Sequence, residues 1–168
     1  SAAESGECLA RVKEIAEKTA GNITSMGMSL GPCIVPASGK AGFELGENEA
    51  EIGMGIHGEP GTHKEMLKSA DEHTEYIMEK ILNESGLEKG DKAAVMINGL
   101  GATPLMELYI INNKVSKILE EKEIKIHKTF VGNYMTALEM PGFSITVLKL
   151  DDELTKYLDF KTEIGIFS

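Results

Sequence analysis

The chain has 168 residues, which favours a single domain, and its 42% hydrophobic and 26% charged residues are typical of a globular protein. Its net charge of −10 would repel nucleic acid phosphates and anionic membranes, so neither is an expected partner. No run approaches the roughly 18 apolar residues of a membrane span, and no signal peptide opens the sequence. Cys8 and Cys33 form no CxxC or His-Cys cluster, which indicates two reduced thiols in a cytoplasmic protein.

The first third of the chain contains one predicted helix and one well-marked strand. Apolar residues recur at three- and four-residue steps over 9–23, which predicts an amphipathic helix. The pattern breaks up over 27–46, where the short apolar run 33–35 is compatible with a strand. Apolar residues alternate with small or charged ones over 51–56, which predicts a strand with two glycines on one face.

Two helices and a central strand are predicted in the middle of the chain. Ser69 and Glu72 have capping-box spacing at the start of a helix that Gly86 should end. The continuous apolar run 93–97 predicts a strand buried on both faces. A helix is then expected over 104–121, with Thr103 as its N-cap residue and Pro104 in its first position.

The last part of the chain adds two strands and a short helix. Alternation over 124–130 and again over 143–147 predicts strands, and Asp151 caps a final helix. These two strands leave no room between them for a crossover helix. We therefore expect an α/β fold with a two-layer mixed β-sheet and helices mainly on one face, in a single domain over 1–168.

His57 is the leading candidate for chemistry. It follows the predicted strand 51–56 and precedes a turn containing Gly58, Pro60 and Gly61. A strand end and a glycine-permitted turn would hold the imidazole firmly and leave space around it. A neutral imidazole is a nucleophile and a hydrogen-bond partner near neutral pH.

Four blocks of sequence, in this order, resemble the sugar-binding subunit or domain of dihydroxyacetone kinases. The resemblance covers nearly the whole chain and rests on these segments: Ser25–Leu30 with Cys33 and Pro36, Gly55–Gly61, Asn98–Tyr109, and Val131–Met140 with Leu148–Asp152. It implies that the chain corresponds to the C-terminal half of such a subunit and that the N-terminal substrate domain is absent. The expected architecture is the second domain of that two-domain α/β subunit.

The resemblance also implies a role for His57, namely attack on the carbonyl carbon of dihydroxyacetone to hold the sugar as a hemiaminal. Gly58 and Glu59 are candidate substrate-binding neighbours. No nucleotide motif or magnesium-binding carboxylate cluster occurs in the sequence, so no cofactor is expected in this chain. In the family, ATP and magnesium belong to a separate kinase subunit or domain, and the general base comes from the N-terminal domain. The chain alone is therefore expected to be inactive as a kinase, and the full-length subunit to be a homodimer.

Several alternatives compete with this interpretation. His57, Glu59 and His63 could be metal ligands, although the cysteines of a zinc deaminase are missing downstream. The glycines of 99–103 could cradle a phosphate at a helix N-terminus or simply allow close packing. His73 and His127 are assigned to polar faces without a role. At the level of function, a dihydroxyacetone-binding transcriptional co-regulator and a purely structural dimerisation domain remain alternatives to the kinase.

Overall fold

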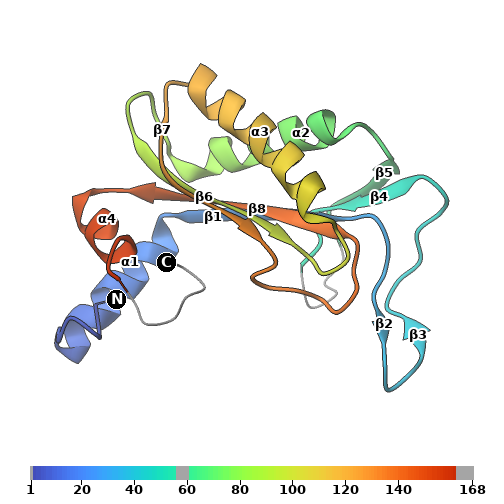
Figure 1. Cartoon of the computed structure of the whole chain (residues 1–168), viewed down its shortest axis with the longest axis horizontal. Helices are drawn as coiled ribbons and strands as arrows, with labels where there is room; N and C mark the ends of the chain where they lie inside the picture. Colours follow the sequence, from blue (N-terminus) through green and yellow to red (C-terminus); the bar gives the residue numbers. More distant parts are fainter. Residues whose placement is uncertain (1, 56–60, 162–168) are drawn as a thin grey trace.

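The computed structural model describes residues 2–55 and 61–161. Within these ranges the chain forms a six-stranded sheet, a two-stranded ribbon and four helices (Figure 1). The elements in chain order are α1 (Leu9–Gly21), β1 (Ile23–Ser29), β2 (Ile34–Val35), β3 (Lys40–Ala41), β4 (Glu49–Ile52), β5 (His63–Met66), α2 (Ala70–Ser85), β6 (Lys92–Gly99), α3 (Leu105–Glu121), β7 (Lys125–Gly132), β8 (Gly142–Leu150) and α4 (Asp152–Leu158).

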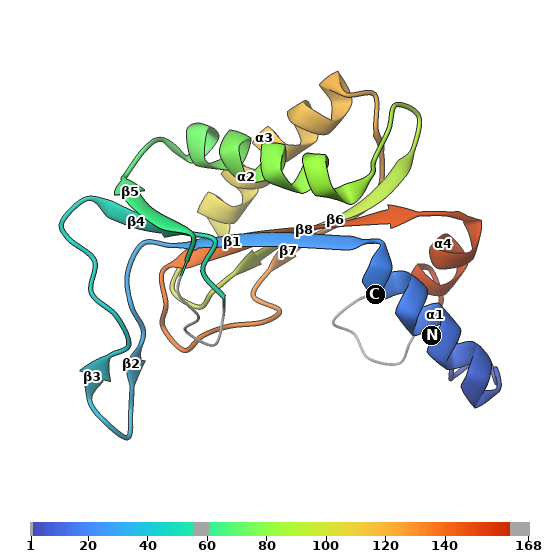
Figure 2. The same cartoon turned by 180° about the vertical axis from the view of Figure 1, so that it is seen from behind.

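The six strands lie in the order β5-β4-β1-β8-β6-β7. Only β6 and β7 run parallel, and every other neighbouring pair is antiparallel. Helices α2 and α3 cover one face of the sheet, whereas α1 and α4 lie together at one end (Figures 1 and 2). The predicted mixed sheet with helices mainly on one face is confirmed. No helix in the described part of the chain is long and apolar enough to cross a membrane.

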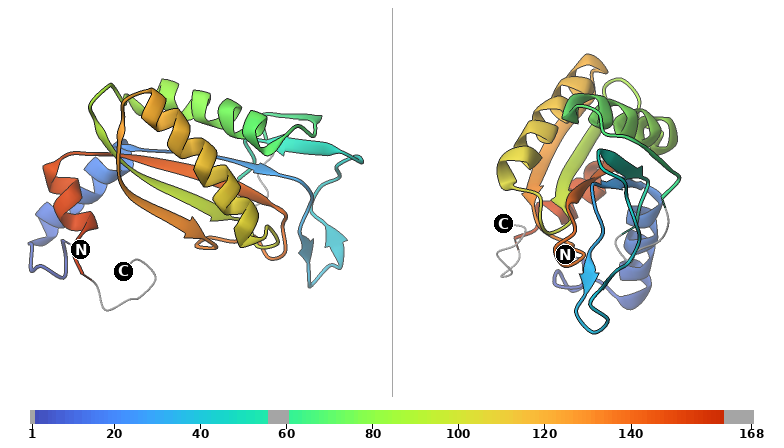
Figure 3. Two further views of the ribbon diagram at one scale, coloured as in Figure 1. Left: turned by 45° about the horizontal axis from the view of Figure 1, so that its top comes forward. Right: turned by 90° about the vertical axis from the view of Figure 1, so that its right-hand side faces the viewer.

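The main core lies between the sheet and helices α2 and α3, as the end-on view in Figure 3 shows. Strand β6 runs between β8 and β7, and Ala93, Val95 and Ile97 are buried against the two helices. The prediction that 93–97 is an interior strand is confirmed. A continuous apolar run succeeds here because both neighbours pair with the strand and few of its side chains reach water.

The predicted ends of the helices are mostly confirmed. The Ser69 hydroxyl accepts the Glu72 N–H, the Glu72 carboxylate accepts the Ser69 N–H, and Gly86 adopts the left-handed conformation that ends α2. Asp151 accepts the Leu154 N–H at the start of α4. The predicted cap of α3 is wrong by one residue. Pro104 is the N-cap, because the Thr103 hydroxyl bonds to the backbone of Gly142 instead.

The prediction for the N-terminal segment is only partly correct. Helix α1 ends at Gly21, and Ile23 begins strand β1, which the sequence interpretation missed. Strand β5 was missed as well.

Ile15 is the only residue of α1 that is buried. Most of the predicted apolar stripe of this helix therefore does not reach the core.

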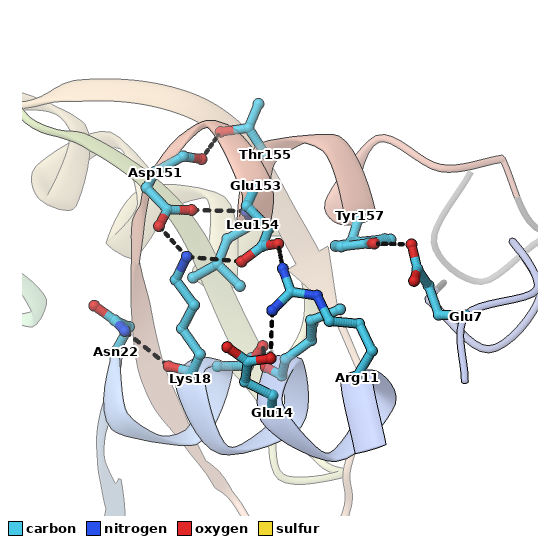
Figure 4. Close-up of polar contacts among 12 residues, drawn as sticks. Glu7, Arg11, Glu14, Lys18, Asn22, Asp151, Glu153, Leu154, Thr155 and Tyr157 are labelled. Carbon is cyan, nitrogen blue, oxygen red and sulfur yellow. Dashed lines mark hydrogen bonds and ion pairs between the residues drawn. The ribbon is translucent and has the colours of Figure 1, made fainter. Parts of the chain in front are cut away.

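Ion pairs hold α1 against α4 (Figure 4). Lys18 pairs with Asp151 and Glu153, and Arg11 pairs with Glu153. The Tyr157 hydroxyl donates to Glu7 over 2.9 Å. Exposed ion pairs contribute little individually, so this end of the molecule depends on a network of them.

The predicted strand over 51–56 is wrong at its C-terminal end. Strand β4 stops at Ile52 because Gly53 has a φ of +79°, which is incompatible with an extended strand. Ile52 belongs to the main core. Met54 packs instead in a second cluster with Leu100 and Met140. The regular alternation of apolar residues therefore does not report a continuous strand here.

We predict that Thr103→Val destabilises the fold by about 1–3 kcal/mol, because both backbone groups of Gly142 lose a buried partner while the shape of the side chain is kept. The Thr103 hydroxyl donates to the Gly142 carbonyl over 2.6 Å and accepts its N–H over 2.8 Å. Urea denaturation measures the change. Thr155→Val removes one exposed bond to Asp151 and should cost far less. Equal losses for the two variants would contradict the prediction.

Candidate functional site

The divergence of β4 from β1 creates a groove in the described structure. The Gly53 N–H still donates to the Gly27 carbonyl over 2.7 Å, but the chain then turns away. Described residues pair with β1 on this side only at Met28 and Ser29. The edge of β1 from Ile23 to Met26 is therefore open, and a groove of about 920 Å³ lies along it.

The groove is bounded by five parts of the fold. Its walls are β1, the helix α2, the uncovered faces of β6 and β8, the chain on either side of residues 56–60, and the loop at Tyr134 and Met135. The lining residues are Ile23–Gly27, Gly53–Gly55, Thr62, His63, Tyr76, Lys80, Ile81, Glu84, Met96, Asn98, Leu100, Tyr134, Met135, Ser144 and Thr146. Among these described residues Glu84 is the only carboxylate.

Hydroxyl and amide groups make the floor of the groove polar. Ser25 and Thr146 lie opposite each other on β1 and β8, and their hydroxyl oxygens are 2.7 Å apart. The amide of Asn98 donates to the Ser144 hydroxyl over 3.3 Å. At one end, His63 lies 3.1 Å from the Thr62 hydroxyl, and its ring meets Tyr76 edge-on. The rest of the lining is mainly apolar, so these few polar groups would orient a ligand within a largely apolar groove.

His57, Gly58 and Glu59, the predicted site residues, lie outside the described residues. The chain on both sides of them is fixed. Gly55 lines the groove before this segment, and Thr62 lines it afterwards. The Gly61 N–H donates to the buried Glu51 carboxylate over 2.7 Å, and the Thr62 N–H donates to the Ile52 carbonyl over 2.7 Å. The two ends of the segment that carries His57 are therefore anchored at the groove.

Asn98 fixes the loop that forms another wall of the groove. Its side-chain oxygen accepts the N–H groups of Tyr134 and Met135 over 2.8 and 2.9 Å. Its amide donates to the Met135 carbonyl over 2.8 Å. Asn98 is 3% exposed. A buried amide with all these partners satisfied holds the loop in one conformation.

The glycines of 99–103 allow close packing, which was one of the two predicted roles. A Cβ on Gly99 would lie 2.2 Å from Oδ1 of Asn133, and one on Gly101 would lie 1.9 Å from the Leu138 carbonyl. The N–H groups of Leu100 and Ala102 donate to the carbonyls of Gly142 and Met140. These N–H groups are engaged in the protein's own loops, which argues against the alternative phosphate cradle.

His73 was assigned to a polar face, and that assignment is wrong. The side chain is 3% exposed and follows the helical face of Ile77 and Ile81. Nε2 accepts the Lys68 N–H over 3.0 Å, and Nδ1 lies 3.4 Å from Oε1 of Glu65. Burial lowers the pKa of His73, and Lys68 acts in the same direction against Glu65. The four-residue spacing of positions 73, 77 and 81 already indicated in the sequence that His73 shares the buried face of the helix.

The alternative of a metal centre receives no support from the described residues. Neither residues 2–55 nor residues 61–161 contain a group of three His, Cys, Asp or Glu side chains placed to hold an ion. His63 lies against Thr62 and Tyr76, and its Nε2 is 4.0 Å from Oε2 of Glu65. Both cysteines are free thiols.

The fold and the groove define a two-layer α/β domain that presents a groove with a few polar groups on its floor at an open strand edge. The model of the Dak1 domain matches residues 1–165, and the chain belongs to this family. It is 46% identical over 158 residues to a Listeria innocua protein named PTS-dependent dihydroxyacetone kinase 1, dihydroxyacetone-binding subunit DhaK. That match covers 94% of this chain and 47% of the relative, so the chain spans about half the length of the relatives it matches.

Two solved structures show the same fold at higher than 25% identity. One is a dihydroxyacetone kinase operon co-activator, Dha-DhaQ, with a TM-score of 0.89, 30% identity, and coverage of 96% of this chain and 50% of the other. The other is the dihydroxyacetone kinase from C. freundii in complex with AMP-PNP and Mg²⁺, with a TM-score of 0.79 and 32% identity. It covers 95% of this chain and 29% of the kinase.

We predict that Asn98→Ala loosens the loop at Tyr134 and Met135, because two backbone N–H groups and one carbonyl lose their buried partner. Hydrogen exchange at these two amides should become at least about tenfold faster, since a lost buried bond costs roughly 1–3 kcal/mol. Asn22→Ala removes a single bond to Lys18 at the other end of the sheet and is the control. Unchanged exchange in Asn98→Ala would show that other contacts fix the loop.

We predict that the free energy of unfolding decreases as the pH falls from about 7.5 to about 5, in part through His73. The pKa of His73 is lowered in the folded state, so the unfolded chain binds the proton more readily. The stabilisation is complete above the ordinary pKa of about 6.5 and is lost as the pH falls through the folded-state value. Urea denaturation across this range should show a smaller slope for His73→Gln than for wild type. A wild-type slope in His73→Gln would refute the assignment.

Proposed function

We propose that this chain is the covalent sugar-binding half of a dihydroxyacetone kinase subunit and that His57 forms the hemiaminal with dihydroxyacetone. The observation that carries the proposal is that the described residues on both sides of the segment 56–60, Gly55 and Thr62, line the same groove. Membership of the Dak1 family and the names of the relatives support the substrate.

The proposed chemistry uses one imidazole nitrogen and the carbonyl of the sugar. The lone pair of the nitrogen attacks C2, a C–N bond forms and the C–O π bond breaks. The carbonyl oxygen takes up a proton to become a hydroxyl group, and the other ring nitrogen releases its proton. This step accepts ketones and aldehydes and rejects glycerol, which has no carbonyl. It also holds a terminal hydroxyl in place for phosphoryl transfer, a reaction that depends mainly on positioning. The hydroxyls of Ser25 and Thr146 are available on the groove floor for the hydroxyl groups of the sugar.

The phosphoryl donor and its metal are proposed to come from a separate nucleotide-binding subunit or domain. In support, the described residues contain no metal-binding group of acidic side chains. The similar structure from C. freundii, a longer chain, is a complex with AMP-PNP and Mg²⁺. Gly58 and Glu59 are proposed neighbours of the sugar. The general base is proposed to lie in the other half of the subunit, so this chain alone is expected not to phosphorylate dihydroxyacetone.

A second candidate function is a dihydroxyacetone-responsive co-regulator without kinase activity. The observation in its favour is the TM-score of 0.89 with the co-activator, against 0.79 with the kinase. Because both proteins share the fold, the covalent site alone does not separate the two functions. Turnover by the full-length subunit with a nucleotide-binding partner would identify a kinase, and its absence despite adduct formation would identify a co-regulator.

We predict that His57→Ala abolishes the adduct with dihydroxyacetone, because the attacking nitrogen is removed. Adding dihydroxyacetone labelled with ¹³C at C2 to the wild-type chain should produce a saturable NMR signal of a quaternary carbon. Part of the groove is open in this chain, so binding should be weak and reversible. His63→Ala, which removes a neighbouring imidazole in the groove, is the matched control and should keep the signal. Formation of the same adduct by His57→Ala would refute the assignment of His57 as the nucleophile.

A further inference from the structure

Strand β4 carries a buried carboxylate. Glu51 has 6% of its surface exposed and is the only acidic side chain buried to this degree within residues 2–55 and 61–161. Its Oε1 accepts the Gly61 N–H over 2.7 Å, whereas its Oε2 is buried and has no hydrogen-bond partner in the described part of the chain. A buried carboxylate that is only half satisfied costs stability. Proteins keep such costly groups mainly where function needs them.

The side chains that face Glu51 from the neighbouring strands leave its charge unpaired. In the register of the sheet, Glu51 lies opposite Ser29 of β1 and Lys64 of β5. Opposite charges in such positions stabilise a sheet when they pair. The Lys64 ammonium instead donates to the Glu44 carbonyl over 2.7 Å, and the Ser29 hydroxyl donates to the Gly31 carbonyl over 2.5 Å. The negative charge of Glu51 is therefore not neutralised by the residues that it faces.

The position of Glu51 relates it to the segment that carries His57. Glu51 lies two residues before Gly53, where the chain leaves β1, and it binds Gly61, where the described chain resumes. Gly61 follows His57 by four residues, which limits the separation of their Cα atoms to about 14 Å for any path of the chain. Charges within this range still interact when one of them is buried, because water and salt screen a buried charge only weakly.

We propose that Glu51 is a positioning residue of the hemiaminal site: it fixes the chain at Gly61, and its buried charge favours positive charge on the ring of His57. This inference rests on the proposed function. As a ring nitrogen bonds to C2 of the ketone, the C–O π bond breaks and the oxygen takes up a proton. The ring is positively charged until its other nitrogen releases its proton. A fixed anion lowers the free energy of this charged ring relative to the neutral ring.

Glu49 offers a matched comparison within the same strand. Its side chain is on the same face of β4 as that of Glu51, because the two residues are separated by one position. Glu49 also accepts a backbone N–H, that of Gly46, over 2.7 Å. The two carboxylates therefore differ mainly in burial and in the segment that each one holds.

Adduct formation and urea denaturation, measured on the same variants of the 168-residue chain, test the proposal. Glu51→Gln keeps an acceptor for the Gly61 N–H and removes the charge. We expect the dissociation constant of the adduct with dihydroxyacetone labelled with ¹³C at C2 to rise at least about fivefold. The midpoint of urea denaturation should not fall, because the half-satisfied charge no longer has to be buried. Glu49→Gln should leave the dissociation constant unchanged.

Glu51→Ala separates the anchor from the charge. Hydrogen exchange at the Gly61 amide should become faster in Glu51→Ala and stay slow in Glu51→Gln, because only the alanine lacks an acceptor. An adduct of wild-type affinity in Glu51→Gln would overturn the proposal. A Glu51→Gln chain that unfolds more readily than wild type would overturn it as well, since the carboxylate would then be structural. A wild-type chain that forms no adduct would instead refute the proposed function, and this proposal with it.

Discussion

The hydrogen bonds of the buried Asn98 amide organise the end of the sheet on which the groove is built. Strand β6 ends here, and its last side chains meet the loop between β7 and β8 instead of water. Because Asn98 binds the N–H groups of Tyr134 and Met135, this loop must lie close to Gly99, the residue after Asn98. At Gly99 even a Cβ would collide with Asn133. Two motifs far apart in the sequence, 98–109 and 131–140, therefore form one interlocked unit.

The groove results from this unit together with a single backbone torsion. At Gly53 a positive φ turns the chain away from β1 and brings Met54 beneath the loop, where it packs with Leu100 and Met140. The edge of β1 is left open, and both ends of the segment that carries His57 remain pinned to β4. A non-glycine residue at 53 would be strained in this conformation, and its Cβ would lie 3.0 Å from Thr62. This path of the backbone therefore requires Gly53. The same path determines where the chain leads into the segment that is proposed to react.

Sequence patterns predicted those elements whose environment is uniform along their length. The strand 93–97 is interior to the sheet, with alternate residues buried under α2 and α3, and α2 has a complete set of local capping signals. The failures occur where tertiary contacts override local pattern. Strand β1 alternates Ser25 and Gly27 with core-facing Met26 and Met28, and a segment with so few branched apolar residues was not recognised as a strand. The strand 51–56 was extended too far because periodicity does not report the sign of φ at Gly53. His73 was misassigned because its polar type was given more weight than its helical spacing.

The groove could not be derived from the sequence alone, for a physical reason. Its floor combines Ser25, Thr146 and Asn98 from three strands that are brought side by side only by the strand order β1-β8-β6. Hydroxyl residues at these positions would be unremarkable on any solvated strand. The proposed nucleophile, in contrast, stands within a continuous motif and is visible in the sequence. In a site of this kind, a short segment of sequence can supply the reactive group. Positioning the ligand, in contrast, depends on side chains that the whole sheet brings together. The same fold occurs in a kinase and in a co-activator, which fits a design in which the parts that determine turnover lie on other chains or domains.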